Sequence, residues 1–298
     1  MKSILIVDAG ATKSEWIMVM PDGDRITVRT AGVNAVTTPR EHMAETFCHA
    51  YSELPDSHSS LDIHYYGAGC ADASCCDMVR TALRKVWQEA CCVEVESDML
   101  GAARALFGTA PGIACILGTG SNSCVYDGEK ITGNIPSLGY ILGDEGSGAA
   151  LGKRLVGDVF KRQLPDEIAR LFADYSGISA AELLHRVYRS SDANRYLASL
   201  VPFLKKNISR QPLYSIVLDE MRRFFSRNAG MYCDARHLPI GVIGSVGGEF
   251  EDIVRKAAAD QGLVVSNVVK SPVDGLLSYH CAYSDESAYA TSKHTATA

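Results

Sequence analysis

One glycine-rich corner in this sequence has the residue types needed to bind a phosphate group. Residues 118–122 (GTGSN) end a short apolar run and are followed by alternating residues and an Asp-Gly turn, which predicts a β-hairpin. Without glycine side chains, the backbone N–H groups and nearby hydroxyls can surround an anion. We therefore expect a phosphate-binding corner formed by Thr119, Gly120 and Ser121, although an isolated GTGS segment can equally be an ordinary tight turn.

A second glycine-rich segment follows this hairpin. Residues 139–152 contain five glycines, and such a density at a helix start indicates that the backbone passes close to a ligand or to a neighbouring chain. Asp144 is expected to begin the helix, since apolar residues recur at helical spacing after it. The segment is therefore a second candidate for ligand binding.

The N-terminus repeats the organisation of the first hairpin. A strand pattern at residues 3–7 ends in Asp8 and a corner at residues 9–14, and two further strands at 15–20 and 25–30 meet at an Asp-Gly turn. Both regions thus contain a strand, a Gly/Thr/Ser corner, a strand, a turn and a strand. This internal repeat predicts two domains of the same architecture.

Helices and strands alternate after each hairpin, so that each half reads β-β-β-α-β-α-β-α. The first half predicts helices at 38–54, 75–90 and 98–107, with Thr38 capping the first of them, and strands at 62–67 and 92–96. The second half predicts helices at 144–162, 249–261 and 274–283 and strands at 239–243 and 263–268. Between them lies a helical insertion at 163–238, in which Ser179 and Glu182 form a capping pair at the start of one helix. The tail at 284–298 is expected to be disordered. We expect domains at 1–110 and 111–283, with the helix at 274–283 packing back on the N-terminal domain.

Composition excludes several classes of function. The chain has 298 residues, a net charge of −6 and a pI of about 5.8, which gives no electrostatic footprint for nucleic acid or for an anionic membrane. No apolar run approaches the roughly 20 residues that span a bilayer, and no signal sequence precedes the first strand, so a cytoplasmic protein is expected. Ten cysteines lack CxxC spacing, and most are expected to be reduced small hydrophobic residues.

Two such halves resemble the sugar kinase/Hsp70/actin superfamily, and the closer similarity is to the BadF/BadG/BcrA/BcrD ATPase and N-acetylglucosamine kinase-like branch. The matching segments extend over nearly the whole chain and are 8–15 (DAGATKSE), Asn34, 97–98 (SD), 118–122 (GTGSN), 139–148 (GYILGDEGSG) and 244–248 (GSVGG). The resemblance implies an α/β fold of two tandem ribonuclease H-like (actin-like ATPase) domains. It also implies an ATP-dependent kinase that phosphorylates a hydroxyl of an amino sugar or N-acetylated hexosamine.

The resemblance further implies individual roles. Asp98 corresponds to the general base that takes the proton of the acceptor hydroxyl, although an aspartate there can also merely cap its helix, and Asp8 would hold Mg²⁺. The ATP phosphates and adenosine would contact Gly10, Thr12, Lys13, Thr119, Gly120, Ser121, Gly244, Ser245, Gly247 and Gly248. The sugar would contact Asn34, Asp98, Asn122, Gly139 and Asp144. Taken alone, the corner at 244–248 is better explained as a plain strand-to-helix turn.

Departures from the family pattern leave the acceptor open. Relatives that phosphorylate N-acetylglucosamine carry aromatic residues where this chain has Val36 and Leu138. Two other functions remain: an ATPase activator of a 2-hydroxyacyl-CoA dehydratase, whose 4Fe–4S cluster takes two thiolates per subunit, and a non-catalytic sugar or nucleotide sensor. Cys115 and Cys124 are the nearest candidates for such thiolates. The expected partners are a small sugar and a second copy of the chain.

Overall fold

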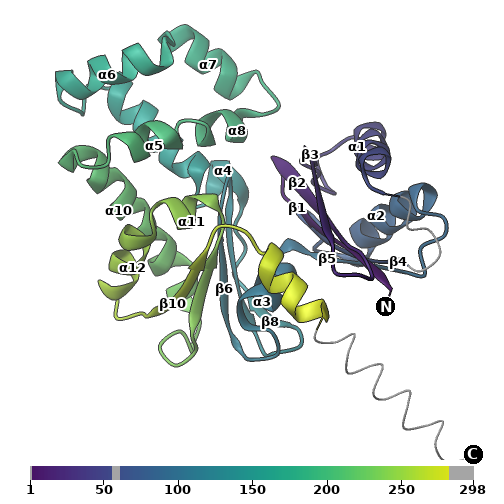
Figure 1. Cartoon of the computed structure of the whole chain (residues 1–298). Helices are drawn as coiled ribbons and strands as arrows, with labels where there is room; N and C mark the ends of the chain where they lie inside the picture. Colours follow the sequence, from purple (N-terminus) through teal and green to yellow (C-terminus); the bar gives the residue numbers. More distant parts are fainter. Residues whose placement is uncertain (1, 56–60, 282–298) are drawn as a thin grey trace, which may run out of the picture. The chain divides into compact units, whose positions relative to one another are not determined.

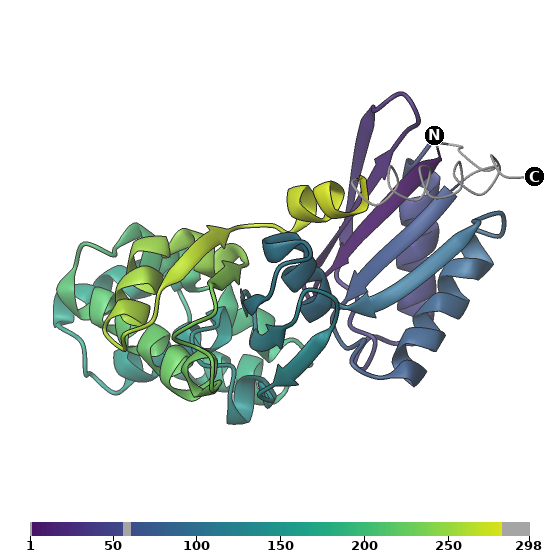
Figure 2. The same ribbon diagram turned by 90° about the horizontal axis from the view of Figure 1, so that it is seen from below.

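The structure, a computed structural model, describes residues 2–55 and 61–281 and divides into two compact units (Figures 1 and 2). The first unit contains the described residues up to Gly108 and those from Pro272 onwards, and the second is Thr109–Ser271. Each unit is built on one five-stranded sheet. The two sheets with their helices confirm the expected α/β fold of two tandem actin-like ATPase domains.

The sheet of the first unit consists of β1 (Ser3–Ala9), β2 (Lys13–Val19), β3 (Arg25–Ala31), β4 (Leu61–Gly67) and β5 (Cys92–Ser97). The strand order is β3-β2-β1-β4-β5; the first three strands are antiparallel, whereas β4 and β5 run parallel to β1. Because the carboxyl ends of parallel strands meet at one edge, the segments that follow β1, β4 and β5 lie next to one another. The predicted carboxylates Asp8 and Asp98 are at this edge.

Helices cover both faces of the first sheet (Figure 1). One face carries α1 (Arg40–Glu53) and α2 (Ala73–Val86), and the other carries α3 (Asp98–Phe107) and a helix at residues 273–281. Strand alternation explains this division, since Leu5 and Val7 pack in the cluster under α1 and α2, whereas Ile6 packs against Leu276 and Leu277. The C-terminal helix therefore belongs to the core of the first unit.

The sheet of the second unit consists of β6 (Gly112–Leu117), β7 (Ser121–Tyr126), β8 (Ile131–Asn134), β9 (Ile240–Ile243) and β10 (Val265–Val269). Its order is β10-β9-β6-β7-β8. As in the first sheet, the first strand of an antiparallel meander has the second meander strand on one side and two parallel strands on the other. The helices α11 (Ser245–Glu249) and α12 (Glu251–Ala259) connect β9 to β10. The repeat deduced from the two hairpins is thus present in the sheets themselves.

The predicted insertion is mostly helical and shares the core of the second unit. After α4 (Gly139–Leu142) and α5 (Gly148–Phe160) come α6 (Asp166–Ser176), α7 (Ala180–Tyr188), α8 (Ala193–Ala198), α9 (Val201–Lys206), α10 (Gln211–Arg227) and a short 3₁₀ helix, η1 (Ala229–Met231). Phe172 and Phe203 meet edge to face at 5.3 Å, and α10 packs against α5 and α12. The Ser179 hydroxyl accepts from the Glu182 N–H, as the capping pair predicts.

Several predicted helix boundaries are wrong. Thr38 does not cap α1; its hydroxyl instead accepts a hydrogen bond from the Asn34 N–H, and Pro39 occupies the cap position. The segment 144–162 is not one helix, because Asp144 has φ 54° and the cap of α5 is Ser147. The segment 249–261 is likewise divided at Phe250, between α11 and α12. The expected tail at 284–298 and the end of the predicted C-terminal helix lie outside the described residues.

The cysteines are reduced thiols, as expected. Cys70, Cys115 and Cys124 are buried, whereas Cys48, Cys91, Cys92, Cys233 and Cys281 are exposed. The burial of each thiol depends on the residues packed around it, which the spacing of cysteines in the sequence does not predict. In the residues that the structure covers, no helix combines the length and the apolar character required to cross a membrane.

Candidate functional site

Asp98 begins α3 but does not cap it. The cap is Ser97, whose hydroxyl accepts from the Leu100 N–H at 3.2 Å, while the Asp98 carboxylate accepts from the adjacent Met99 N–H at 2.9 Å. Burial raises the pKa of Asp98 to about 6, against the lowering effect of the Met99 N–H. The carboxylate is therefore suited to take a proton near neutral pH, and the simple capping explanation is wrong.

Asp8, at the end of β1, shares the electrostatic environment of Asp98. Burial raises its pKa to about 7, with smaller contributions from Asp98 and Glu15, while Lys13 acts in the opposite direction. A divalent cation beside Asp8 would offset the cost of burying the charged carboxylate, so Asp8 is suited to be a magnesium ligand. The described ranges contain no group of three His, Cys, Asp or Glu side chains able to hold a metal, so such an ion would need oxygens of water or phosphate as its other ligands.

The corner of the first hairpin is a tight turn that rests on Gly32. The Gly10 N–H donates to the Lys13 carbonyl at 3.0 Å, and the Gly32 N–H donates to the Thr12 carbonyl at 3.1 Å. A Cβ on Gly32 would lie 2.5 Å from the Gly10 oxygen, so only glycine allows this approach. Thr12 and Lys13 remain exposed. Sequence reasoning missed Gly32, although a glycine directly after a strand is a recognisable signal.

Asn34 is held with one of its polar groups free for a ligand. Its Oδ1 accepts from the Val36 N–H at 2.9 Å and the Thr37 N–H at 3.3 Å, so the Nδ2 group is the one left to bind a hydroxyl. Gly69, with φ 81°, approaches so closely that a Cβ there would lie 2.6 Å from Asn34 Oδ1. Gly69 therefore fixes Asn34 against the loop after β4. Sequence reasoning did not identify it.

The second glycine corner is braced by the start of α5. The Gly148 N–H donates to the Gly118 carbonyl at 2.8 Å, and the Ala149 N–H donates to the Thr119 carbonyl at 3.1 Å. The Ser121 N–H donates to Asp144 Oδ1 at 3.3 Å, and a Cβ on Gly120 would lie 3.1 Å from Asp144 Oδ2. The Ser121 N–H is thus already occupied by Asp144. A phosphate contact from Ser121 would therefore have to come from its side-chain hydroxyl.

Asp144 is a buried acid in a strained backbone conformation. Burial raises its pKa to about 6, opposed by the Ser121 N–H and reinforced by the charge of Glu145. Its φ of 54° is maintained by the bond from its own N–H to the Ser137 carbonyl at 3.0 Å. A Cβ on Gly143 would lie 1.9 Å from that same carbonyl oxygen. Strain maintained in this way at a buried acid is typical of a functional position.

Asn122 is oriented by a side chain from the neighbouring strand. Its Oδ1 accepts from Asn134 Nδ2 at 3.0 Å and from the Ser123 N–H at 2.9 Å, which again leaves an Nδ2 donor. Gly139, with φ 70°, is exposed and has open space where a side chain would be. Leu138 is 63% exposed, so its side chain is accessible to a ligand.

The GSVGG corner packs directly on the end of β6. A Cβ on Gly244, which has φ 124°, would lie 2.3 Å from the Leu117 carbonyl oxygen, and one on Gly247 would lie 2.7 Å from Val242 Cγ1. Packing alone explains Gly244 and Gly247. It also explains Gly248, because a Cβ there would lie 2.4 Å from Lys270 Cγ. Ser245 is exposed. The contact places this corner beside Gly118, but a role in adenosine binding stays a prediction.

Each unit thus assembles part of the predicted set. The first brings together Asp8, Asp98, Asn34 and the corner of Gly10, Thr12 and Lys13 at one sheet edge. The second brings the corner of Thr119, Gly120 and Ser121 beside Asp144, Asn122 and the corner at Gly244. Carboxylates with raised pKa values next to glycine corners fit phosphoryl transfer to an alcohol.

Comparison with known proteins agrees with this chemistry. The chain matches no protein-family model and no curated protein. Among solved structures it is similar to a candidate N-acetylglucosamine kinase from Porphyromonas gingivalis, at 37% identity and a TM-score of 0.89 over 93% of this chain and 98% of that one. It shares its fold with a candidate N-acetylglucosamine kinase from Chromobacterium violaceum, at 19% identity and a TM-score of 0.73 over 94% and 99% of the two chains. It also shares the fold of a ROK family glucokinase from Streptomyces griseus, solved with glucose and AMPPNP, at 19% identity and a TM-score of 0.53 over 92% and 96%.

Proposed function

The chain belongs to the sugar kinase family that includes the Porphyromonas gingivalis protein, within the actin-like ATPase superfamily, and we propose that it phosphorylates a hydroxyl of an N-acetylated hexosamine or amino sugar with ATP. The observation that carries the proposal is Asp98, an acid of raised pKa at the start of a helix that it does not need to cap. We further propose membership of the BadF/BadG/BcrA/BcrD branch, on the motifs at 8–15 and 118–122.

In the proposed reaction, Asp98 takes the proton of the acceptor hydroxyl as the oxygen attacks the γ-phosphorus of ATP. The bond between the γ-phosphorus and the β–γ bridging oxygen breaks, and ADP leaves. Asp8 would hold Mg²⁺, which when bound neutralises charge on the phosphates. Lys13 and Thr119 contact phosphate oxygens. The Nδ2 donors of Asn34 and Asn122 and the carboxylate of Asp144 bind sugar hydroxyls, which orients the acceptor and excludes water as a competing nucleophile.

The acceptor class rests on the family and on two exposed side chains. Val36 is 70% exposed and Leu138 63% exposed, at the two positions where aromatic residues stack on the sugar ring in N-acetylglucosamine-phosphorylating relatives. Smaller aliphatic side chains leave more room there. We therefore propose that a hexosamine with a bulky substituent, such as N-acetylmuramic acid, is accepted as well as N-acetylglucosamine.

The other two functions have weaker support. Cys115 and Cys124 are both completely buried, and burial raises the pKa of the Cys115 thiol, so neither can offer a thiolate to a cluster shared with a second subunit. A non-catalytic sensor has no physical need for a base with the properties of Asp98. A homodimer located in the cytoplasm completes the proposal.

A screen for ADP release tests this function. Glucosamine, N-acetylglucosamine, N-acetylmuramic acid and glucose are each supplied with ATP and Mg²⁺, and Asp98→Asn is the matched inactive control. Sugar-dependent ADP release by the wild type, with a mass increase of one phosphate on an amino sugar, is expected. Release that is independent of sugar, or present with glucose alone, would contradict the proposed acceptor class.

A further inference from the structure

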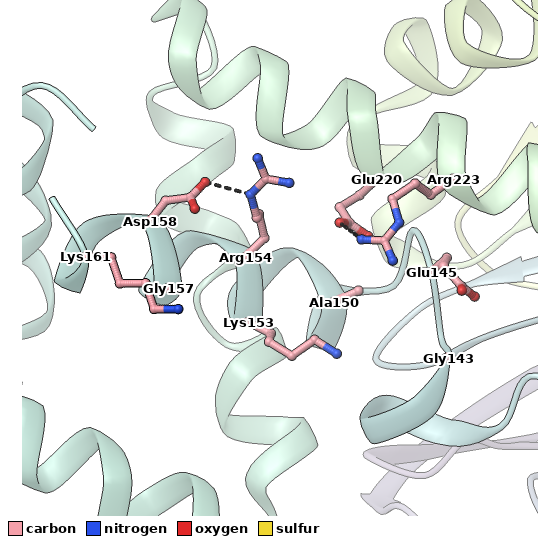
Figure 3. A pocket seen from close by; sticks show the side chains of 10 residues that line it. All are labelled: Gly143, Glu145, Ala150, Lys153, Arg154, Gly157, Asp158, Lys161, Glu220 and Arg223. Atoms are coloured by element: carbon pink, nitrogen blue, oxygen red, sulfur yellow. Dashed lines mark hydrogen bonds and ion pairs between the residues drawn. The ribbon is translucent and has the colours of Figure 1, made fainter. Parts of the chain in front are cut away.

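A cavity of about 260 Å³ lies between α5 and α10 in the second unit (Figure 3). None of the residues assigned to ATP or sugar lines it. Its walls are mostly charged and include the basic side chains Lys153, Arg154, Lys161 and Arg223. The volume is close to the lower end of the range for small-molecule sites, roughly 300–1,000 Å³, so a metabolite with a single ring fits.

The positive charge of this cavity is not fully neutralised. Two of its acids are paired within it: Asp158 with Arg154 at 2.7 Å and Glu220 with Arg223 at 3.0 Å. The third, Glu145, is paired at 2.6 Å with Arg227, which does not line the cavity.

The two lysines therefore carry the excess charge. Lys153 Nζ donates to the Tyr140 carbonyl at 2.9 Å, and Lys161 forms no ion pair with any residue in the described ranges. In a chain of net charge −6, a partly open cavity with two exposed ammonium groups favours a dianion. Asp144 offsets part of the Lys153 charge, so Lys161 carries most of the excess. Figure 3 shows both lysines on one side of α5 and the Arg154 and Asp158 pair on the other.

Gly157 in the cavity wall has no structural explanation. It lies inside α5, where glycine destabilises a helix relative to alanine, and a Cβ built on it meets nothing within 4 Å. Gly152, one turn earlier, is different, since a Cβ there would lie 1.9 Å from the Leu197 carbonyl oxygen. Packing requires glycine at 152 but not at 157, and the space at 157 is open to a ligand.

Glu220 gives the other end of the cavity a different character. It is only 3% exposed, and Arg223 binds its Oε1 atom. A buried carboxylate facing a cavity accepts hydrogen bonds from hydroxyl or ammonium groups. The cavity thus offers cations at one end and an acceptor at the other.

We propose that this cavity binds a sugar phosphate, with the phosphate monoester at Lys153 and Lys161 and the sugar hydroxyls at Glu220, and that the ligand regulates the enzyme. The regulatory part rests on the proposed function, whereas the binding part does not. Glu145 lines the cavity and directly follows Asp144, and Lys153 holds the carbonyl of Tyr140, next to Gly139. A phosphate that draws Lys153 away from Tyr140 changes the segment that carries the proposed sugar ligands.

Calorimetric titration of the full chain tests the binding. The probes are N-acetylglucosamine 6-phosphate, glucose 6-phosphate and inorganic phosphate, which separates a requirement for the sugar from binding of phosphate alone. We expect the sugar phosphates to bind more tightly than inorganic phosphate. Lys161→Gln should weaken that binding about tenfold or more, because it removes one charged donor.

Variants and a competition experiment decide the result. Gly157→Leu, which fills the cavity, should abolish binding, while Lys130→Gln, an exposed lysine on the same unit, should leave it unchanged. Equal affinity of the probe for wild type, Lys161→Gln and Gly157→Leu would overturn the site. Displacement of the probe by the acceptor sugar would also overturn it, because the probe would then be bound at the substrate residues. If the probe binds but sugar KM and kcat do not respond to it, the regulatory part is wrong, and the ADP-release screen remains independent of either outcome.

Discussion

The Asp144 carboxylate accepts a hydrogen bond from the backbone N–H of Ser121, with 3.3 Å between Oδ1 and N. This contact joins the glycine loop before α5 to the corner of the second hairpin. An acid proposed to bind sugar is thereby held against a corner proposed to bind phosphate. The Asp144 side chain contacts that corner directly, so a change at Asp144 is informative about both groups.

Asp144→Asn should raise the sugar KM by about 10–100-fold, because a neutral amide loses a charge-assisted hydrogen bond of roughly 1.5–3 kcal/mol. The ATP KM should change little, since the amide oxygen still accepts from Ser121. Steady-state kinetics with each substrate varied in turn measure both constants. A larger effect on ATP than on sugar would move Asp144 to the nucleotide.

Asp98→Asn should lower kcat by about 10²–10⁴-fold, the usual contribution of a general base, while sugar affinity stays nearly unchanged. Single-turnover rates and calorimetric titration with the sugar measure the two effects. In the wild type, kcat should fall as pH drops below about 6, where the carboxylate of raised pKa becomes protonated. A fully active variant would remove Asp98 from the mechanism.

The same variant should be more stable than the wild type at about pH 8. The folded pKa of Asp98 is raised from 3.8 to about 6, so its contribution to stability is present below 3.8 and is lost as pH rises through 6. The asparagine does not carry this penalty. Thermal melting should therefore show a gain of a few degrees at about pH 8, a smaller gain at about pH 5, which lies between the two pKa values, and almost none at about pH 3.5. A lower melting temperature at all three values would indicate a structural role.

Lys13→Ala and Thr119→Ala should raise the ATP KM several-fold to about 100-fold and leave the sugar KM nearly unchanged, because phosphate contacts are made in both ground and transition states. Lys130→Ala, at an exposed position of a turn, is a matched control for the loss of a lysine. An effect confined to the sugar KM would show that the two hairpins do not bind the nucleotide.

A partly buried polar network links α3 to the C-terminal helix. Arg104 donates to the Tyr66 hydroxyl at 2.8 Å and to Glu94 at 3.1 Å, and Tyr66 is bonded to His280 Nε2 at 2.8 Å. His64 binds the other Glu94 oxygen at 2.8 Å and stacks on His280 with 3.7 Å between ring centroids. Burial, followed by the charge of His64, lowers the pKa of His280 to about 3.

This network should make stability depend on pH. Because the folded pKa of His280 is depressed from 6.5 to about 3, its contribution is present above 6.5 and is lost as pH falls toward 3. His280→Phe keeps an aromatic ring but removes the bond between the Tyr66 hydroxyl and Nε2, leaving only the bond from Arg104, so it should destabilise by about 1–3 kcal/mol at about pH 8 and by less at about pH 5. Urea unfolding at both values measures the difference, with exposed His42→Phe as the control; an equal loss at both would contradict the depressed pKa.

Much of the fold is determined locally and could be predicted from the sequence. Strand alternation, Asp-Gly turns and helical periodicity depend on near neighbours, so the two three-stranded meanders, the order of elements and the helical insertion are as predicted. Helix starts were less predictable. Thr38 and Asp144 are both good capping residues by type. The Thr38 hydroxyl instead accepts a hydrogen bond from the Asn34 N–H within the same loop, and contacts with Ser137 and Ser121 hold Asp144 outside α5.

Residue type and motif spacing by themselves predicted the glycine corners, because binding of a phosphate requires close approach of backbone N–H groups. The resemblance to a known family implied the roles of the acids, and these roles stay predictions. Only the tertiary structure decided how these residues are supported. Gly32 and Gly69 are required by close approach of distant backbone, and the Ser121 N–H is taken by Asp144 across 23 residues. The raised pKa values of Asp8, Asp98 and Asp144 arise mainly from burial, which depends on packing between segments far apart in the chain and so leaves no local signal in the sequence.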